Sequence, residues 1–287
     1  MSLDPRPTGP HSDAAPGHPG AVSDPDAAPG HPGAPSGTDA LDRVVISTLA
    51  ERPELTGRLY EIDEDWPAFI GHDPAASTLL TWVPELFPAS CVVATEGDRV
   101  IARGFSVPFA ADVDGRRETP DGGWSRVLRW AFTDRWTGRT VTAASALEIT
   151  IDTGHLGRGL SHRMLAALRR TAAQQGLGVL LAPVRPTAKH LRPRLPMAAY
   201  ARERRDDGLP TDPWLRVHVR AGGTVESVAS ASMTVSAPLA RWREWTGLPF
   251  DRDGDVEVPG ALVPVHCDLT HDHAVYVEPN VWVRHTL

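Results

Sequence analysis

A glycine-rich turn in the middle of the chain is the segment best suited to bind an anion. It covers residues 153–159, Thr-Gly-His-Leu-Gly-Arg-Gly, and opens into a stretch with helical spacing. Backbone amides at the start of a helix have no partner within the helix, and glycines let an anion approach them closely. The turn has neither the Gly-Lys-Ser/Thr of a Walker loop nor the G-x-G-x-x-G of a dinucleotide fold. We therefore expect the amides of Gly157 to Ser161 to bind a phosphate group.

Two regular elements must hold this turn in place. Residues 141–152 are expected to form a long strand, because apolar and polar side chains alternate in its second half. After the turn, Leu160, Met164 and Leu168 share one face of a helix from Leu160 to Gln175, and Gly176 is suited to end it. The turn thus joins the end of a strand to the start of a helix.

Ahead of the long strand, the pattern is strand, helix, helix and hairpin. Residues 44–49 are a β-branched run, and residues 51–62 and 75–86 are helix candidates. The hairpin at residues 90–108 turns at Glu-Gly-Asp. The polar stretch from residue 112 to 139 contains a short helix, and we interpret this stretch as an insertion.

Behind the turn, the chain again mixes strands and helices. A strand at residues 179–182 is closed by prolines, and a second insertion covers residues 185–211. Asp212-Pro213 predicts a helix start, because Asp can cap free amides and Pro suits the first helical position. That helix covers residues 214–221. The remaining expected elements are a helix at 238–246 and strands at 224–236, 261–268 and 274–283.

The segment from Glu148 to Leu168 resembles the pyrophosphate loop of the GNAT superfamily of N-acetyltransferases. The family pattern Gln/Arg-x-x-Gly-x-Gly/Ala is matched by residues 156–161, Leu-Gly-Arg-Gly-Leu-Ser. The chain departs from it at Leu156, where the family has Gln or Arg, and at Ser161, where it has Gly or Ala. The order of elements over residues 44–235 is also similar. The resemblance implies an α/β fold with a GNAT-type mixed, splayed central sheet flanked by helices, with insertions and extra C-terminal strands.

The resemblance also implies a donor and the residues that bind it. In the family, acetyl-CoA or another acyl-CoA places its pantetheine arm along the long strand, a role that falls here on Ile149, Thr150 and Ile151. The pyrophosphate would be held at the loop, with help from the helix dipole. The residues implied there are Leu156, Gly157, Arg158, Gly159, Leu160 and Ser161.

The family's reaction is direct attack of an amine on the thioester, and the resemblance implies two catalytic residues. Glu148 lies at a strand position where some members place a general base. His218 lies four residues before Gly222, where the family helix usually has a Tyr that acts as the acid, and imidazole titrates near neutral pH. The alternatives are a salt-bridged or solvent-facing Glu148 and a His218 on the helix surface.

Other titratable residues lie near the expected site. Tyr200 and Tyr276 are further phenols behind the loop, although buried tyrosines often bond only to the protein. His155 and His162 flank the loop and could contact phosphate or solvent. A basic cluster could reach the nucleotide phosphate of CoA, or it could belong to a solvated loop; it comprises Arg185, Lys189, Arg192 and Arg194.

Four residues near the C-terminus offer nitrogen and sulfur to a metal: His266, Cys267, His271 and His273. Zinc prefers this mixture of ligands. However, the H-x-H spacing falls beside a turn between two expected strands, and no second Cys pair appears. We therefore expect no metal site.

Composition restricts the class of protein and its domains. The 287 residues carry a formal charge of −7 and two cysteines, and no apolar run approaches the length of a membrane span. Residues 1–40 contain the unit DAAPGHPGA twice and few bulky apolar side chains, so we expect a disordered tail without a targeting signal. We expect a GNAT-like core over 41–236 and a C-terminal extension over 237–287 packed on it.

These observations favour a cytoplasmic acyltransferase that modifies a small-molecule amine, and they point to neither nucleic acid nor a membrane as partner. A homodimer is one possible form of the protein, and the sequence does not decide on it. A second hypothesis is a non-catalytic GNAT-like module that binds acyl-CoA or an acyl-carrier protein. A third is a metal-dependent or structural protein built around the C-terminal histidines.

Overall fold

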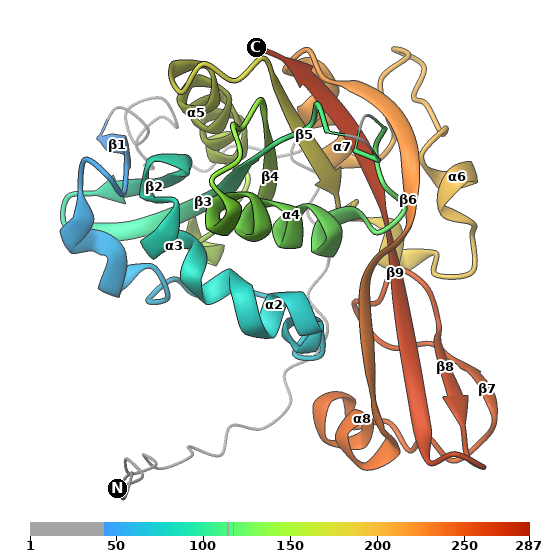
Figure 1. Ribbon diagram of the computed structural model, residues 1–287. Helices are drawn as coiled ribbons and strands as arrows, with labels where there is room; N and C mark the ends of the chain where they lie inside the picture. Colours follow the sequence, from blue (N-terminus) through green and yellow to red (C-terminus); the bar gives the residue numbers. More distant parts are fainter. Residues whose placement is uncertain (1–42, 114, 117) are drawn as a thin grey trace, which may run out of the picture. The chain divides into compact units, whose positions relative to one another are not determined.

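The computed structural model describes residues 43–113, 115–116 and 118–287, all of which belong to one folded unit, Ser36–Leu287. The tail expected over residues 1–40 lies outside the described residues. Within the described part, helices and strands form the mixed α/β fold that the sequence predicts (Figure 1).

A nine-stranded mixed sheet runs through this unit. The strand order is β1-β2-β3-β4-β5-β9-β8-β7, and β6 pairs with β9 outside this path. Neighbouring strands are antiparallel except for β4 and β5, which are parallel. The strands are β1 Val44–Thr48, β2 Cys91–Glu96, β3 Arg99–Phe109, β4 Ala143–Ile151, β5 Val179–Val184, β6 Thr224–Pro238, β7 Gly254–Val256, β8 Val265–Asp268 and β9 His273–Thr286.

Seven α-helices and six short 3-10 turns accompany the sheet within the described residues. The α-helices are α2 Pro74–Leu79, α3 Val83–Leu86, α4 Gly123–Thr137, α5 Leu160–Gln174, α6 Met197–Tyr200, α7 Pro213–Arg220 and α8 Leu239–Thr246. The 3-10 turns are η1 Pro53–Arg58, η2 Ile70–His72, η3 Leu80–Trp82, η4 Pro88–Ser90, η5 Thr153–His155 and η6 Lys189–Leu191. At α7, Asp212 accepts hydrogen bonds from the amides of Trp214 and Leu215, so the helix start expected at this position is confirmed.

Two apolar clusters cover the two faces of the sheet. On one face, Leu128 and Phe132 of α4 pack in a cluster with Phe105 of β3, and α2 and α3 extend this layer. On the other face, Met164 and Leu168 of α5 pack in a second cluster, which also includes residues of α7. Figure 1 shows α4 and α5 on opposite sides of the strands. The sheet thus holds β4 between two helical layers.

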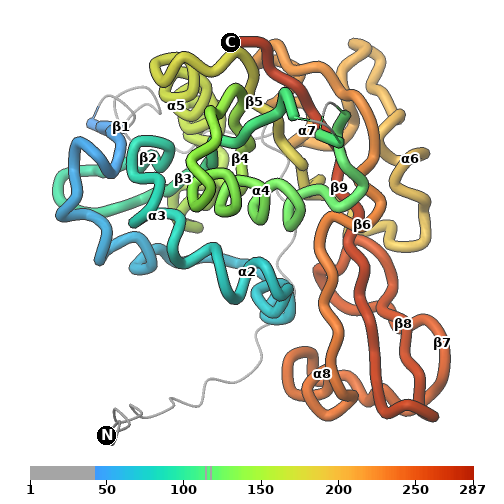
Figure 2. Tube along the Cα trace, in the orientation of Figure 1, coloured from blue at the N-terminus to red at the C-terminus, as the bar shows by residue number. Residues whose placement is uncertain are grey.

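A third cluster lies where β6 and β9 extend beyond these layers. The tubes of the two strands run side by side in Figure 2, and α8, β7 and β8 pack around their far end. Trp242 of α8 is fully buried and donates a hydrogen bond from Nε1 to the carbonyl of Ala274, 2.9 Å away. Phe69 packs against both Trp242 and Tyr276 in this cluster. It therefore ties the region before α2 to the C-terminal strands.

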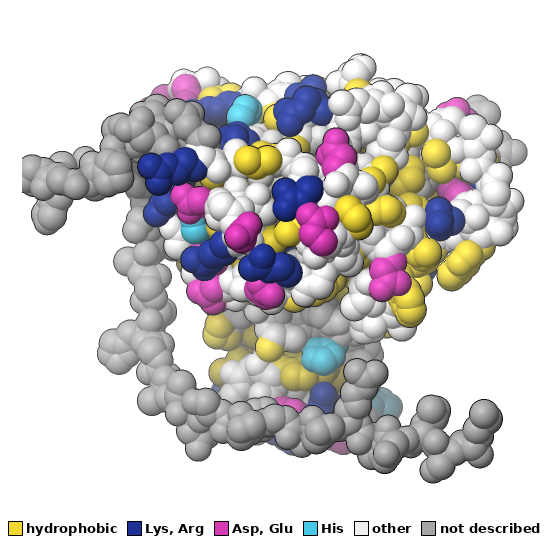
Figure 3. Space-filling model, turned by 90° about the vertical axis from the view of Figure 1, so that its left-hand side faces the viewer, with side chains coloured by type: hydrophobic (Ala, Val, Ile, Leu, Met, Phe, Trp, Pro, Cys, Tyr) yellow, Lys and Arg dark blue, Asp and Glu magenta, His cyan; other side chains and the backbone are white. Residues whose placement is uncertain are grey.

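The edge of the sheet that carries β1 presents acidic and basic side chains interspersed with one another (Figure 3). Ion pairs in this part of the fold include Arg58–Glu61 at 3.1 Å and Arg99–Asp152 at 2.6 Å. The Arg58–Glu61 pair is exposed on both sides, and pairs of that kind contribute little to stability. Their main effect is a surface of mixed charge.

Two expectations about the elements are wrong. The stretch from residue 112 to 139 is not an insertion with a short helix, because α4 buries Trp124, Val127 and Leu128 against the sheet. Polar side chains on the outer face of α4 dilute the apolar pattern of the inner face. The helix expected over residues 51–62 is only the 3-10 turn η1, Pro53–Arg58.

The expected domain boundary also differs from the structure. The division between residues 236 and 237 falls inside β6, and the expected C-terminal extension supplies β9, which hydrogen bonds to both β5 and β6. Strand pairing between distant segments depends on the tertiary partner rather than on local sequence. The last fifty residues therefore complete the sheet instead of packing on it.

Candidate active site

Strands β4 and β5 separate after a short stretch of pairing. Their ladder contains only Ala144 opposite Leu180 and Ser145 opposite Leu181, whereas β4 stays paired with β3 as far as Ile151. From residue 146 onward, β4 therefore has one edge bonded to β3 and another edge without a β5 partner. An unpaired strand edge can accept an extended ligand through main-chain hydrogen bonds. We call this opening the V.

A β-bulge marks the point where the V begins. Phe105 of β3 lies opposite Glu148 and Ser106 opposite Ala146, so Leu147 is an extra residue on β4. Trp124 of α4 donates a hydrogen bond from Nε1 to the carbonyl of Leu147 at 2.8 Å. Because a bulge increases strand twist and bends the strand, it helps β4 to turn away from β5.

The glycine-rich turn follows directly after the free half of β4. Gly157 and Gly159 have φ of 74° and 77°, and Gly159 is the N-cap of α5 without any side-chain cap. Among the described residues, no hydrogen bond occupies the amides of Gly157 to Ser161. Leu156, one of the two positions that depart from the family pattern, is 59% exposed. Free amides and the positive end of the helix dipole make this turn suitable for a pyrophosphate.

The strand residues expected to bind the pantetheine arm all lie on the free half of β4. The side chains of Ile149 and Ile151 pack against the α5 cluster. Thr150 points the other way and accepts a hydrogen bond from Trp66 Nε1, 3.3 Å from its Oγ1. Both faces of this half-strand are thus supported while one backbone edge stays available.

Glu148 lies at the bulge with its side chain only 10% exposed. Arg103 donates from Nε to Glu148 Oε1 at 2.7 Å. Burial raises the pKa of Glu148, Arg103 offsets part of that rise, and the nearby Glu64 carboxylate adds to it. Glu148 is thus a buried, ion-paired carboxyl group at the start of the V.

His218 is buried rather than lying on the helix surface. Its Nδ1 is 3.0 Å from Nε2 of His285, and burial together with His285 lowers the pKa of His218 to about 3. His285 pairs with Leu180, which in turn pairs with Ala144. Ala144, at the level of His285, is therefore about 13 Å from Glu148 along β4. The structure therefore does not bring His218 and Glu148 together.

The other phenols and the histidine beside the loop have partners within the protein. The Tyr200 hydroxyl donates to Asp212 Oδ2 at 2.8 Å, and the Tyr276 hydroxyl donates to Glu278 Oε2 at 2.7 Å. The ring of His155 lies 3.0 Å from Asp152 Oδ1 and 3.3 Å from Glu96 Oε2. These contacts give each group a role in holding the fold.

The basic residues at positions 185–194 also have partners within the protein. Lys189 is fully buried, and its Nζ donates to three carbonyls, including that of Leu262 at 2.6 Å. Arg192 makes two bonds to Glu203, and Arg194 pairs with Glu257. Lys189 is therefore part of the core, whereas Arg192 and Arg194 lie on an exposed, solvated loop with their charges paired.

The four C-terminal residues considered as metal ligands have separate surroundings. Cys267 is buried in the third cluster, while His271 pairs with Asp268 and His273 contacts Ser236. Within the described residues, no group of three or more His, Cys, Asp or Glu side chains is arranged to hold a metal ion.

A segment that the sequence did not single out covers the free half of β4. We call residues 59–66 the strap. The carbonyl of Leu59 accepts from Arg103 Nη1 at 3.0 Å, and Glu64 Oε2 lies 2.6 Å from Arg103 Nη2. At its end, Trp66 bonds to Thr150 and places its ring 5.8 Å from the guanidinium of Arg185, which directly follows β5. The strap therefore reaches both arms of the V.

One signal could have identified Arg103. It is the charged residue in the middle of an otherwise apolar strand, VIARGFSV, and it is only 4% exposed. Charged side chains are almost never fully buried unless they are paired. Such an arginine predicts carboxylate partners close to it, which the structure shows to be Glu148 and Glu64.

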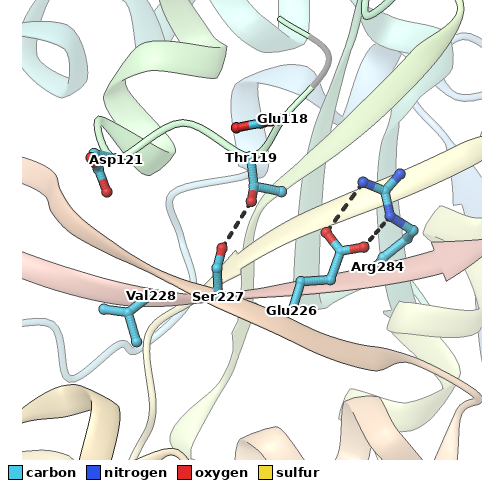
Figure 4. Close-up of a pocket in the computed structure, with 7 residues that line it drawn as sticks. All are labelled: Glu118, Thr119, Asp121, Glu226, Ser227, Val228 and Arg284. Carbon is cyan, nitrogen blue, oxygen red and sulfur yellow. Dashed lines mark hydrogen bonds and ion pairs between the residues drawn. The ribbon is translucent and has the colours of Figure 1, made fainter.

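A polar pocket lies elsewhere, beside β6 and β9 (Figure 4). The hydroxyls of Thr119 and Ser227 are 2.8 Å apart in it, and Arg284 makes two bonds to Glu226. The other residues that line it are Glu118, Asp121 and Val228. None of the predicted site residues lines this pocket.

Within the described residues, no helix is long and apolar enough to cross a membrane. No family model matches the chain. The arginine N-acetyltransferase avaD of Aspergillus versicolor is 32% identical over 274 residues, which span 84% of this chain and 93% of that protein.

Among solved structures, the loading GNATL domain of CurA from Lyngbya majuscula is similar, with a TM-score of 0.53 and 14% identity. The similarity covers 85% of this chain and 97% of that domain, and it shows a shared fold. The relative at 32% identity shows the family. The chain belongs to the GNAT family of N-acetyltransferases.

Proposed function

We propose that this protein transfers an acetyl group from acetyl-CoA to the primary amine of a small cationic molecule such as arginine. The observation that carries the proposal is the V itself: β4 has an edge without a β5 partner from residue 146 onward. The unoccupied amides of Gly157 to Ser161 lie directly after that edge in the chain.

The residues of the V fit the chemistry of coenzyme A. A pantetheine arm carries amide groups that can pair with the free edge of Ile149 to Ile151, as an added strand would. A pyrophosphate suits the amides at the start of α5. Bound there, acetyl-CoA would supply a thioester whose acetyl group can be transferred.

Glu148 is the group that we assign to proton removal. The amine enters as an ammonium ion and leaves as an amide, so its nitrogen loses two protons. Glu148 accepts the first, which frees the lone pair that forms the bond to the acetyl carbon. The carbon–sulfur bond breaks, and the second proton goes to the sulfur of the departing thiol. A buried carboxyl group with a raised pKa is a stronger base than an exposed one.

Two observations support a cationic acceptor. The relative at 32% identity is named an arginine N-acetyltransferase. In this chain, Asp65 and Trp66 are adjacent and exposed on the strap, where Trp66 reaches both arms of the V. A carboxylate and an indole face both attract ammonium or guanidinium groups.

The test is to incubate the protein with acetyl-CoA and a panel of amines, and to follow free thiol and acetylated amine together. We expect both products with arginine and much less with a neutral amine of similar size. A stabilisation of the protein by acetyl-CoA without release of thiol would instead favour the non-catalytic binding module. The absence of any stabilisation by acetyl-CoA would contradict both.

A further inference from the structure

Arg103 of β3 stands between two carboxylates, on the side of β4 away from β5. Its guanidinium is buried, with Nε 2.7 Å from Glu148 and Nη2 2.6 Å from Glu64. Its third nitrogen donates to the carbonyl of Leu59 at 3.0 Å. All three nitrogens of the guanidinium are therefore bonded, one to β4 and two to the strap.

Aromatic rings fix the guanidinium from its faces. The carbon at its centre lies 5.0 Å from the centroid of the Tyr60 ring and 6.0 Å from that of Phe105. A planar cation held at this distance from a ring gains cation–π stabilisation, and its orientation is restricted. Arg103 thus presents Nε to Glu148 in one fixed geometry.

The charges of this cluster do not balance when both carboxylates are ionised. One guanidinium faces two carboxylates, so the three side chains carry a net charge of −1. When Glu148 takes a proton, Arg103 keeps Glu64 as its counter-ion and the cluster becomes neutral. Without Glu64, protonation of Glu148 would leave a buried cation unpaired, which is strongly unfavourable.

The other titratable groups around Glu148 are uncharged at neutral pH. Tyr60 comes from the strap, and Cys91 comes from β2; both feel the charge of Glu148, and burial raises the pKa of each. On β4 itself, the neighbouring side chain on the same face is the neutral Thr150. Arg103 and Glu64 are therefore the charges that act on Glu148 at close range.

We propose that Arg103 and Glu64 are positioning residues that act through Glu148. Arg103 fixes the Glu148 carboxylate at the start of the V, and Glu64 keeps Arg103 paired when Glu148 accepts the proton of the amine. The proposal rests on the function proposed above, because it assumes that Glu148 is the base. It adds that the strap controls how readily that base takes its proton.

The experiment compares the pH dependence of kcat/KM for wild type, Glu64→Gln and Arg103→Gln. Removing the negative charge of Glu64 disfavours a protonated Glu148, so the acidic limb of the profile moves to lower pH. Removing the positive charge of Arg103 has the opposite effect, so the limb moves to higher pH. We expect shifts of about one pH unit in each direction. Arg103→Lys keeps the charge and should bring the limb part of the way back.

The matched control is Glu61→Gln, which removes a strap carboxylate that pairs with the exposed Arg58 instead. The acidic limb of the kcat/KM profile of this variant should stay at the wild-type pH. Limbs that do not move, or that move in the same direction in both variants, overturn the proposal. If Arg103→Gln does not fold, Glu64→Gln decides alone, since Glu64 is more than one-third exposed and tolerates an amide.

Glu148→Gln distinguishes a failure of the proposed function from a failure of the positioning role. If the acidic limb persists in Glu148→Gln, Glu148 is not the base and the proposed function must change. If Glu148→Gln abolishes the limb while Glu64→Gln and Arg103→Gln leave it where it is in wild type, only the positioning role is wrong.

Discussion

Glu148 is subject to two opposing influences at one carboxyl group. Burial raises its pKa, and the ion pair with Arg103 at 2.7 Å lowers it. A buried carboxylate with a raised pKa accepts a proton more readily than an exposed one, and Arg103 offsets part of that rise. Neither burial alone nor an exposed ion pair would give this behaviour.

Replacing Glu148 with Gln tests this role directly. The amide keeps the size of the side chain but cannot accept a proton, so kcat should fall by about 10²- to 10⁴-fold. The affinity for acetyl-CoA should stay within a factor of about three, because the donor is bound by backbone groups. Steady-state kinetics and calorimetric titration measure the two effects. Wild-type turnover in this variant would contradict the assignment.

The buried pair His218 and His285 carries a prediction about stability. Burial lowers the pKa values to about 3 and about 4, from an ordinary value of 6.5. Among the described residues, His218 Nε2 and His285 Nδ1 are buried without a hydrogen-bond partner. In the unfolded chain both rings take up protons as pH falls below about 6.5, whereas in the folded protein they stay neutral.

The free energy of unfolding should therefore decrease as pH falls from about 6.5 toward 4. Each histidine contributes at most about 1.4 kcal/mol per pH unit within this window. Urea denaturation at several pH values measures the slope. Carboxylates add to the same trend, so the informative quantity is the difference from His218→Phe, which should have a shallower slope. Equal slopes would contradict the buried, neutral state of His218.

At the scale of elements, α5 begins and ends at glycines with the same backbone conformation. Gly159 at its start and Gly176 just after its end have φ of 77° and 76°, and a Cβ at either position would meet nothing within 4 Å. An alanine at either position should therefore cost a similar 1–2 kcal/mol or so of strain. Only Gly159 lies where a pyrophosphate would approach.

Gly159→Ala should weaken acetyl-CoA binding by about tenfold, because the added Cβ and the strained turn disturb the amides that hold the anion. Gly176→Ala is the matched control: a similar loss in thermal stability with unchanged affinity. Calorimetric titration of both variants separates these effects. Equal affinity in the two variants would show that the turn does not bind the donor.

The elements that the sequence predicts well are those with local signals. The alternation in β4, the glycines at residues 157 and 159, and the Asp212-Pro213 start of α7 need no distant partner to be recognised. The strap could not be found in this way. Glu64 and Arg103 are far apart in the chain, and their ion pair exists only because β3 lies beneath the strap.

For the whole molecule, the C-terminal strand is the clearest case of a feature set by distant contacts. β9 pairs with β5 through Val281 to Thr286, and with β6 along almost its entire length. The sequence predicts a strand there, but not its place in the sheet, because local alternation does not specify a partner. That pairing also decides the domain organisation.

A truncation that removes residues 237–287 should therefore abolish folding rather than trim a peripheral extension. It takes away β9, which pairs with both β5 and β6, and it removes most of the third apolar cluster. It also uncovers the side chains that pack with Trp282 and Val283 in the other two clusters. We expect no cooperative thermal transition by circular dichroism. A truncation of residues 1–35, which removes none of the described residues, should keep the transition of the full chain. A cooperative transition without residues 237–287 would contradict the single sheet.

Hydrogen exchange with and without acetyl-CoA tests directly whether the V and its turn form the donor site. We expect slower exchange at the free half of β4 and through the turn, over residues 146–161, and unchanged exchange in α8. Pairing with the donor would protect the β4 edge that has no β5 partner. Binding of acetyl-CoA with no protection of residues 146–161 would show that the donor binds elsewhere.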